Sequence, residues 1–175
     1  MMVIDISLND YNLKEKEAFI VDTNVWIYLF SPFSNKDYGY SDFLSAALDK
    51  KCRLYVNNQI ISEYINVICR VAYQNYLHNN HLNARNFKFK KDYQKTDDFQ
   101  SYYKIACNSV KDDILKYSKI LPIKLWHIRK GLNQFDKMND FNDLIYVQML
   151  SKKLKIVSHD KDFSSYPGNI VWLHF

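Results

Sequence analysis

The sequence has little glycine and proline, with three of each among its 175 residues. Long flexible linkers and disordered segments are usually rich in such residues, so neither is expected in this chain. By contrast, 47% of the residues are hydrophobic and 16% are aromatic, which is enough apolar surface for a substantial core. Length and composition together predict a single globular domain over residues 1–175.

Cysteine is also scarce, and it does not cluster. Cys52, Cys69 and Cys107 lie far apart and form no CxxC pair. The histidines are dispersed as well. His78 and His81 are three residues apart, but no second group of ligand residues accompanies them. A disulfide framework and a structural zinc site are therefore not expected. An odd set of unclustered thiols is typical of proteins in a reducing cytoplasm.

Long hydrophobic runs are absent from the sequence. None approaches the roughly 20 residues that a membrane-spanning helix requires. Near the N-terminus, Asp5, Asn9 and Asp10 interrupt the stretch that would form the apolar part of a signal peptide. We therefore expect a cytoplasmic protein that does not associate with a membrane.

Short apolar runs alternate with amphipathic helical patterns along the chain. Strands are predicted over residues 18–21, 53–56, 122–126, 154–158 and 169–173. Helices are predicted over about 23–30, 40–51, 59–79 and 98–119, and over a last segment that contains Asp140 and Asp143 and ends near Lys152. This alternation is typical of an α/β fold with a central, mainly parallel sheet of four or five strands. Residues 1–17 form either an extra edge strand or a loose arm.

Residues 80–97 are the most polar stretch of a chain whose net charge is +5. We predict a polar loop or a helical protrusion here. The segment interleaves basic and aromatic side chains, and single-stranded RNA is bound by such combinations. Lys88 and Lys90 are candidates for phosphate contacts, and Phe89 and Tyr93 for stacking on bases. The alternative, which stays open, is that the lysines form a solvated surface without a ligand.

Four acidic residues lie where predicted strands end or predicted helices begin. Asp22 and Asp160 follow strands, whereas Glu63 and Asp143 lie near helix starts. Ligands bind at the carboxyl ends of the strands in parallel sheets. Carboxylates that converge there repel one another, and a divalent cation removes that repulsion. An all-oxygen ligand set favours Mg²⁺ or Mn²⁺ over zinc, and such sites activate water for attack on phosphodiesters.

Asp22 and Glu63 also have structural interpretations that involve no ligand. Asp22 suits a turn or a helix cap, in which case it needs no ligand. If Asp22 binds a metal, Thr23 or Asn24 is placed to orient it or to hold a coordinated water. Glu63 in the first turn of a helix complements the helix dipole. Its neighbours are of the buried type, which favours an inward orientation instead.

Asp140, Asp143, Asp160 and Asp162 likewise have both structural and functional interpretations. Asp140 precedes an apolar run and is the better cap for the predicted helix, three residues before Asp143. Asp143 lies among apolar residues, where an unpaired carboxylate is costly. Asp160 follows a strand, and Asp162 is an alternative cap for a short turn at the same place.

Four segments, in order along the chain, resemble the conserved blocks of the PIN-domain ribonucleases: FIVDTNVWIYLF, ISEYINVI, NDFNDLIYVQML and IVSHDKDF. The chain is most similar to the VapC-type toxins of bacterial toxin–antitoxin pairs, over about Phe19 to Leu173. This resemblance implies a three-layer α/β/α PIN fold and a Mg²⁺- or Mn²⁺-dependent endoribonuclease site. It also implies an RNA substrate, a small antitoxin partner and a homodimer.

The resemblance assigns roles to individual residues. The catalytic acids it implies are Asp22, Glu63, Asp143 and Asp160, of which Asp22, Asp143 and Asp160 bind the metal. The supporting positions are Thr23, Ser158, Asp140 and Asp162. The chain departs from the small VapC toxins in its greater length, which lies in the N-terminal arm and in residues 75–120.

Two other functional classes remain open. A non-catalytic RNA-binding module that keeps the PIN fold usually lacks one or more of the acids, and all four are present here. A structure-specific DNA nuclease of related fold normally needs further acids and a helical clamp, which the sequence does not reveal. Metal-dependent cleavage of RNA or of DNA, or binding without cleavage, distinguishes the three classes.

Overall fold

The structure is a computed structural model that describes residues 3–151 and 153–175. Its centre is one parallel sheet with the strand order β1-β6-β5-β2-β3-β4. The strands are β1 (Ile4–Ser7), β2 (Ala18–Val21), β3 (Arg53–Val56), β4 (Ser118–Ile120), β5 (Lys155–Val157) and β6 (Val171–His174). The predicted α/β class is confirmed, and the sheet has six strands where four or five were expected.

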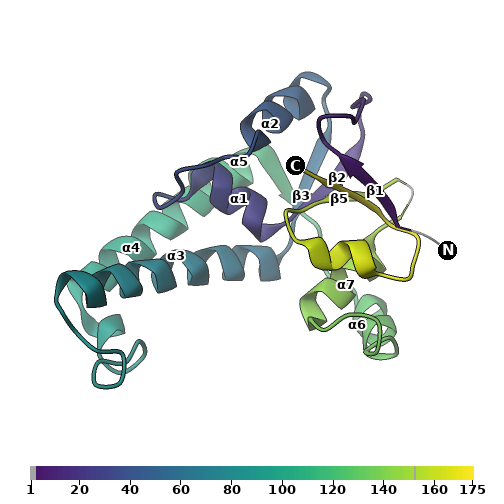
Figure 1. The fold of residues 1–175 in the computed structure, drawn as a ribbon. Coiled ribbons are helices and arrows are strands. Elements are labelled where there is room, and N and C mark those ends of the chain that lie inside the picture. The colour runs from purple at the N-terminus through teal and green to yellow at the C-terminus, as the bar shows by residue number, and fades with distance from the viewer. Residues whose placement is uncertain (1–2, 152) are drawn as a thin grey trace.

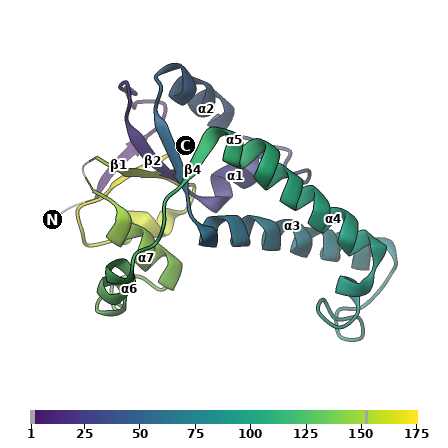
Figure 2. The same ribbon diagram turned by 180° about the vertical axis from the view of Figure 1, so that it is seen from behind.

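Helices flank this sheet (Figures 1 and 2). They are α1 (Thr23–Phe30), α2 (Tyr40–Asp49), α3 (Asn58–Asn79), α4 (Asp97–Ser109), α5 (Leu115–Tyr117), α6 (Leu125–Leu132) and α7 (Phe141–Met149). A π-helical segment (Val110–Ile114) joins α4 to α5, so the helix predicted over 98–119 is divided and ends at Tyr117. The end predicted near Lys152 falls outside the described residues, and α7 ends at Met149. Among the described helices, none has the length and apolarity needed to cross a membrane.

The middle of the sheet is buried on both faces. All four residues of β2 are buried, as expected for a strand with parallel neighbours on each side. Val21 at the end of β2 pairs with Val157 at the end of β5. The residues that follow these two strands, Asp22 and Ser158, therefore emerge side by side at the carboxyl edge of the sheet.

The N-terminal segment contributes the edge strand rather than a loose arm. β1 pairs in parallel with β6, in a register that places Ile4 opposite Val171. The backbone N–H of Ile4 also donates a hydrogen bond to the carbonyl of Ile170, at 2.9 Å. Of the two alternatives for this segment, the described residues contain the extra strand, over Ile4–Ser7.

The strand predicted over residues 122–126 is wrong. The chain pairs with β3 earlier, through β4, and the last contact is the N–H of Leu121 donating to the carbonyl of Val56 at 2.7 Å. Pro122 follows, and among the described residues no backbone hydrogen bond to β3 is formed beyond Leu121. Helix α6 begins three residues later, where the His127 side chain accepts a hydrogen bond from the N–H of Lys124.

Helices α3 and α4 run side by side and project from the sheet as an arm (Figures 1 and 2). The tip of the arm, residues 80–96, is irregular apart from one 3₁₀ turn (Tyr93–Lys95). Phe89 is 9% exposed and Tyr93 is 0% exposed, because both rings pack with α3 residues in a second apolar cluster. The guanidinium of Arg70 lies 4.1 Å from the centre of the Phe89 ring. Neither ring is free to stack on a base, which corrects the role expected from the sequence.

Candidate metal centre

An acidic cavity of about 310 Å³ opens at the carboxyl edge of the sheet. Its walls come from α1, α3, the start of α7 and the turn that follows β5. The acidic residues that line it are Asp22, Glu63, Asp140, Asp143, Asp160 and Asp162. The fold thus brings together the four acids singled out from the sequence and both supporting aspartates.

Asp22 is buried at the base of this cavity, with 7% of its surface exposed. As the N-cap of α1, its Oδ1 accepts a hydrogen bond from the N–H of Thr23 at 2.7 Å. Its Oδ2 accepts two more, from Ser158 Oγ at 2.6 Å and Asn24 Nδ2 at 2.7 Å. Burial raises the pKa of Asp22 to about 6, although the hydrogen bonds from Ser158 and Thr23 act in the opposite direction.

Ser158 and Asn24 join the turn after β5 to α1. Ser158 Oγ accepts a hydrogen bond from the N–H of Asp160 at 3.0 Å while donating to Asp22. Asn24 Oδ1 accepts from the N–H of His159 at 2.9 Å. These bonds fix the direction of the turn, and with it the position of Asp160 opposite Asp22.

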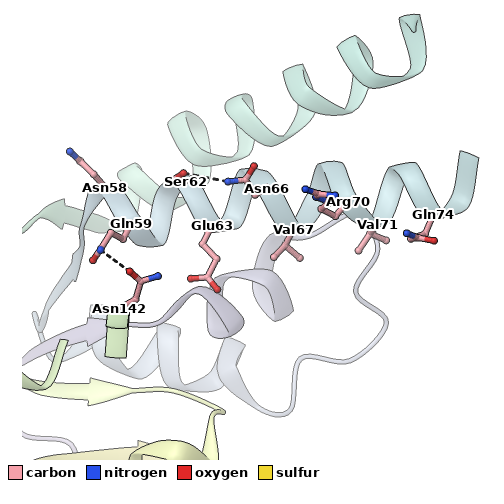
Figure 3. A pocket seen from close by; sticks show the side chains of 10 residues that line it. All are labelled: Asn58, Gln59, Ser62, Glu63, Asn66, Val67, Arg70, Val71, Gln74 and Asn142. Carbon is pink, nitrogen blue, oxygen red and sulfur yellow. Dashed lines mark hydrogen bonds between the residues drawn. The ribbon is translucent and has the colours of Figure 1, made fainter. Parts of the chain in front are cut away.

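Glu63 reaches the cavity from α3. Its Oε2 accepts a hydrogen bond from the Thr23 hydroxyl at 2.8 Å. The residue is exposed, and its side chain points away from α3 toward the neighbouring elements (Figure 3). The Thr23 hydroxyl therefore connects Glu63 to the element that carries Asp22.

The start of α7 supplies two carboxylates, one that accepts hydrogen bonds and one that does not. Asp140 caps the helix, since its Oδ1 accepts hydrogen bonds from the N–H groups of Asn142 and Asp143. No residue in the described part of the chain donates a hydrogen bond to the Asp143 carboxylate. Burial, followed by the charges of Asp22 and other carboxylates, raises the pKa of Asp143 to about 8. Asp143 is thus the acid with the greatest need of a positive partner.

Three of the carboxylates are spaced for a shared cation. Oxygen atoms of Asp143, Asp160 and Asp162 all lie within 4.8 Å of one another. The ligand set expected from the sequence had Asp22 where this group has Asp162, and Asp22 lines the same cavity. An all-carboxylate site of this kind fits Mg²⁺ or Mn²⁺, which prefer oxygen ligands. The donors present therefore fit a divalent cation.

Two polar residues that line the cavity, Asn142 and Tyr146, were not singled out from the sequence. Asn142 accepts a hydrogen bond from Gln59 Nε2 at 2.7 Å, which connects α7 to α3 (Figure 3). Tyr146 follows Asp143 by one helical turn, and its hydroxyl has no hydrogen-bond partner among the described residues. Tyr146 is three residues after Asp143, so both lie on one face of α7. This spacing is the sequence feature that could have identified Tyr146.

A groove of about 630 Å³ adjoins the acidic cavity along α3 (Figure 3). Glu63 and Asn142 line both spaces, so the two are neighbours. Farther along α3 the groove is lined by Val67, Arg70 and Gln74. It extends from the acids toward the tip of the arm.

Comparison with known proteins agrees with this geometry. The family model described as the PIN domain matches residues 19–169. The chain belongs to the PIN-domain family. PIN domains are generally nucleases, and they generally use divalent metal ions. The acidic cavity of this PIN domain is the place where such an ion fits.

The fold also has a counterpart among solved structures. It is similar to a chain in the crystal structure of VapBC2 from Rickettsia felis bound to a DNA fragment from their promoter, with a TM-score of 0.54. The similarity covers 90% of this PIN domain and 98% of that chain, at 10% sequence identity. None of the curated proteins matches the sequence. At so low an identity, the likeness shows the fold alone.

Proposed function

We propose that this PIN domain is a Mg²⁺- or Mn²⁺-dependent endoribonuclease that hydrolyses phosphodiester bonds in RNA. The observation that carries the proposal is the convergence of six carboxylates from separate elements in one cavity. The high pKa of Asp143, which burial and like charges produce, supports a cation as the missing partner. Membership of a family of nucleases supports a nucleic acid as the substrate.

Individual side chains have separate tasks in this proposal. Asp22, Asp143 and Asp160 hold the cation, with Asp162 close enough to share it. When bound, the cation supplies positive charge near the scissile phosphate and activates water. Glu63 faces the same space and is suited to accept a proton. Supporting roles fall to Thr23, Ser158 and Asp140, which orient Glu63, Asp22 and the start of α7 respectively.

We further propose that the protein is the toxin of a toxin–antitoxin pair and acts in the cytoplasm. The similarity in fold to a chain of the VapBC2 complex from Rickettsia felis supports this proposal. A small antitoxin and a second copy of the chain are its expected partners. Production of the wild-type chain alone in bacteria should arrest growth, whereas the Asp22→Asn variant should not.

Cleavage of matched RNA and DNA strands by the purified protein tests the nuclease. We expect cleavage of single-stranded RNA with Mg²⁺ or Mn²⁺, none in EDTA, and a loss of about 100-fold or more in Asp22→Asn. Asp112→Asn is the matched control, because Asp112 is exposed and lies on the π-helical segment away from the cavity. Preferred cleavage of DNA would favour the structure-specific DNA nuclease. RNA binding without any cleavage would favour the non-catalytic module.

A further inference from the structure

Tyr146 is a buried tyrosine whose hydroxyl has no partner. The residue is 1% exposed, and no described residue forms a hydrogen bond with its oxygen. Tyr64 is buried to the same extent, yet its hydroxyl is hydrogen-bonded to Ser109 Oγ at 3.0 Å. A buried polar group without a partner lowers stability, so its presence in a folded protein calls for an explanation.

The unpaired hydroxyl belongs to the wall of the acidic cavity. Tyr146 lines that cavity from α7, one turn after Asp143. Helical side chains lean toward the N-terminus of their helix, which directs Tyr146 toward the turn that carries Asp143. A tyrosine hydroxyl is protonated at neutral pH, so this group can donate a hydrogen bond.

The neighbouring carboxylates differ in how many acceptor positions they have left. A carboxylate offers about four lone pairs. Asp22 already accepts three hydrogen bonds, so a bound cation would take its last position. The Asp143 carboxylate accepts none from the described residues, so it keeps room for both a cation and a donor.

We propose that Tyr146 is a positioning residue whose hydroxyl donates a hydrogen bond to the Asp143 carboxylate when a divalent cation occupies the cavity. One oxygen of Asp143 then faces the cation and the other faces the tyrosine. Outer hydrogen bonds of this kind orient metal ligands and increase their affinity for the metal. The hydroxyl is buried too deeply to be reached by substrate, so it acts through Asp143. The inference rests on the proposed function, in that it requires a cation at this site.

Two Tyr→Phe variants test the inference, since each removes a single oxygen atom. Melting is measured in EDTA, and Mn²⁺ affinity is measured by titration calorimetry. Tyr146→Phe should melt at the wild-type temperature or above, because it removes an unpaired group, and should bind Mn²⁺ about 10-fold more weakly or worse. Tyr64→Phe, the control, should melt at a lower temperature and bind Mn²⁺ as the wild type does. RNA cleavage by Tyr146→Phe should recover at saturating Mn²⁺.

The outcomes separate this inference from the proposed function. If the wild-type protein takes up no Mn²⁺, both fall together. If it binds Mn²⁺ and Tyr146→Phe binds equally tightly, only the role of Tyr146 is wrong. A melting temperature of Tyr146→Phe in EDTA as low as that of Tyr64→Phe would also overturn the inference, because the hydroxyl would then have a partner in the metal-free protein.

Discussion

The fold removes the carboxyl groups of Asp22 and Asp143 from water, and it replaces the lost hydrogen bonds for Asp22 only. Three hydrogen bonds reach Asp22, and its pKa rises to about 6. Asp143 receives none from the described residues, and its pKa rises to about 8. The fold therefore holds Asp22 ready in one orientation and leaves Asp143 dependent on a cation for its charge.

The stability of the metal-free protein should fall as the pH rises. Both carboxyls have a higher pKa in the folded chain than in the unfolded chain, where it is about 3.9. The folded state thus binds more protons above that pH, and the free energy of unfolding decreases up to pH about 6 for Asp22 and about 8 for Asp143. Solvent screening at the partly exposed Asp143 limits its share to about 2 kcal/mol.

Chemical denaturation in EDTA between pH 5 and 8 measures this effect. Asp143→Asn removes the carboxyl, so the part of the decrease that extends above pH about 6 should disappear in the variant. Asp112→Asn should keep the wild-type profile. A difference between the wild type and Asp143→Asn that does not change with pH would contradict the prediction.

Sequence analysis located the acids of the cavity together with Thr23, Asn24 and Ser158, and missed Asn142 and Tyr146. A carboxylate next to a predicted buried strand or helix stands out in the sequence, because Asp and Glu are rarely buried without a partner. Tyr146 lies among apolar residues on α7, where the sequence is equally consistent with a core tyrosine. Asp162 was interpreted as an alternative turn cap, and only the fold shows its carboxylate beside those of Asp143 and Asp160.

At the scale of elements, the strands next to the site were predictable and β4 was not. A short apolar run that is followed by an aspartate indicates a buried parallel strand, as β2 is. Residues 122–126 have similar apolarity, but a short apolar run does not distinguish a strand from a helix start. The outcome depended on which residues pair with β3, and that pairing begins at Ser118.

The length of α3 sets the distance between the acids of the cavity and the tip of the arm. Sixteen residues separate Glu63 from Asn79 at the end of the helix, a distance of about 24 Å at about 1.5 Å per residue. Lys88 and Lys90 are exposed on the tip beyond that end. If an RNA strand contacts both the acids and these lysines, the groove on α3 offers a path between them (Figure 3).

The double variant Lys88→Gln/Lys90→Gln tests this path. If both lysines contact phosphates, the variant should bind single-stranded RNA more weakly whatever the sequence, and the slope of log affinity against log salt should decrease by about 1.4. Binding is measured by fluorescence anisotropy over a range of salt concentrations. Lys50→Gln/Lys51→Gln is the matched control, because both lysines are exposed after α2 and away from the arm. Equal slopes for the two variants would assign the tip lysines to a solvated surface.

At the scale of the whole molecule, a basic chain surrounds an acidic site. The net charge of +5 favours approach of a polyanion, whereas the six carboxylates of the cavity repel phosphate until their charge is neutralised. The alternation of strands and helices was sufficient to predict the parallel sheet. The number of strands was not predictable, because β1 has four residues and none of them is fully buried. A solved structure shares this fold at 10% sequence identity, so the residues at most positions can differ without a change of architecture.

A cation that binds only the folded chain must stabilise the whole molecule. At a Mn²⁺ concentration 100 times its dissociation constant, the gain is about 2.7 kcal/mol, or about 5–10 °C in the melting temperature of a chain of this length. Differential scanning calorimetry with Mn²⁺, and with NaCl at equal ionic strength, measures the shift. Asp22→Asn should lose most of it if the proposed role of the buried Asp22 as a ligand is right, and Asp112→Asn should keep it. A shift of equal size in Asp22→Asn would show that Asp22 does not hold the cation, and would leave Asp143, Asp160 and Asp162 as the carboxylates spaced to bind it.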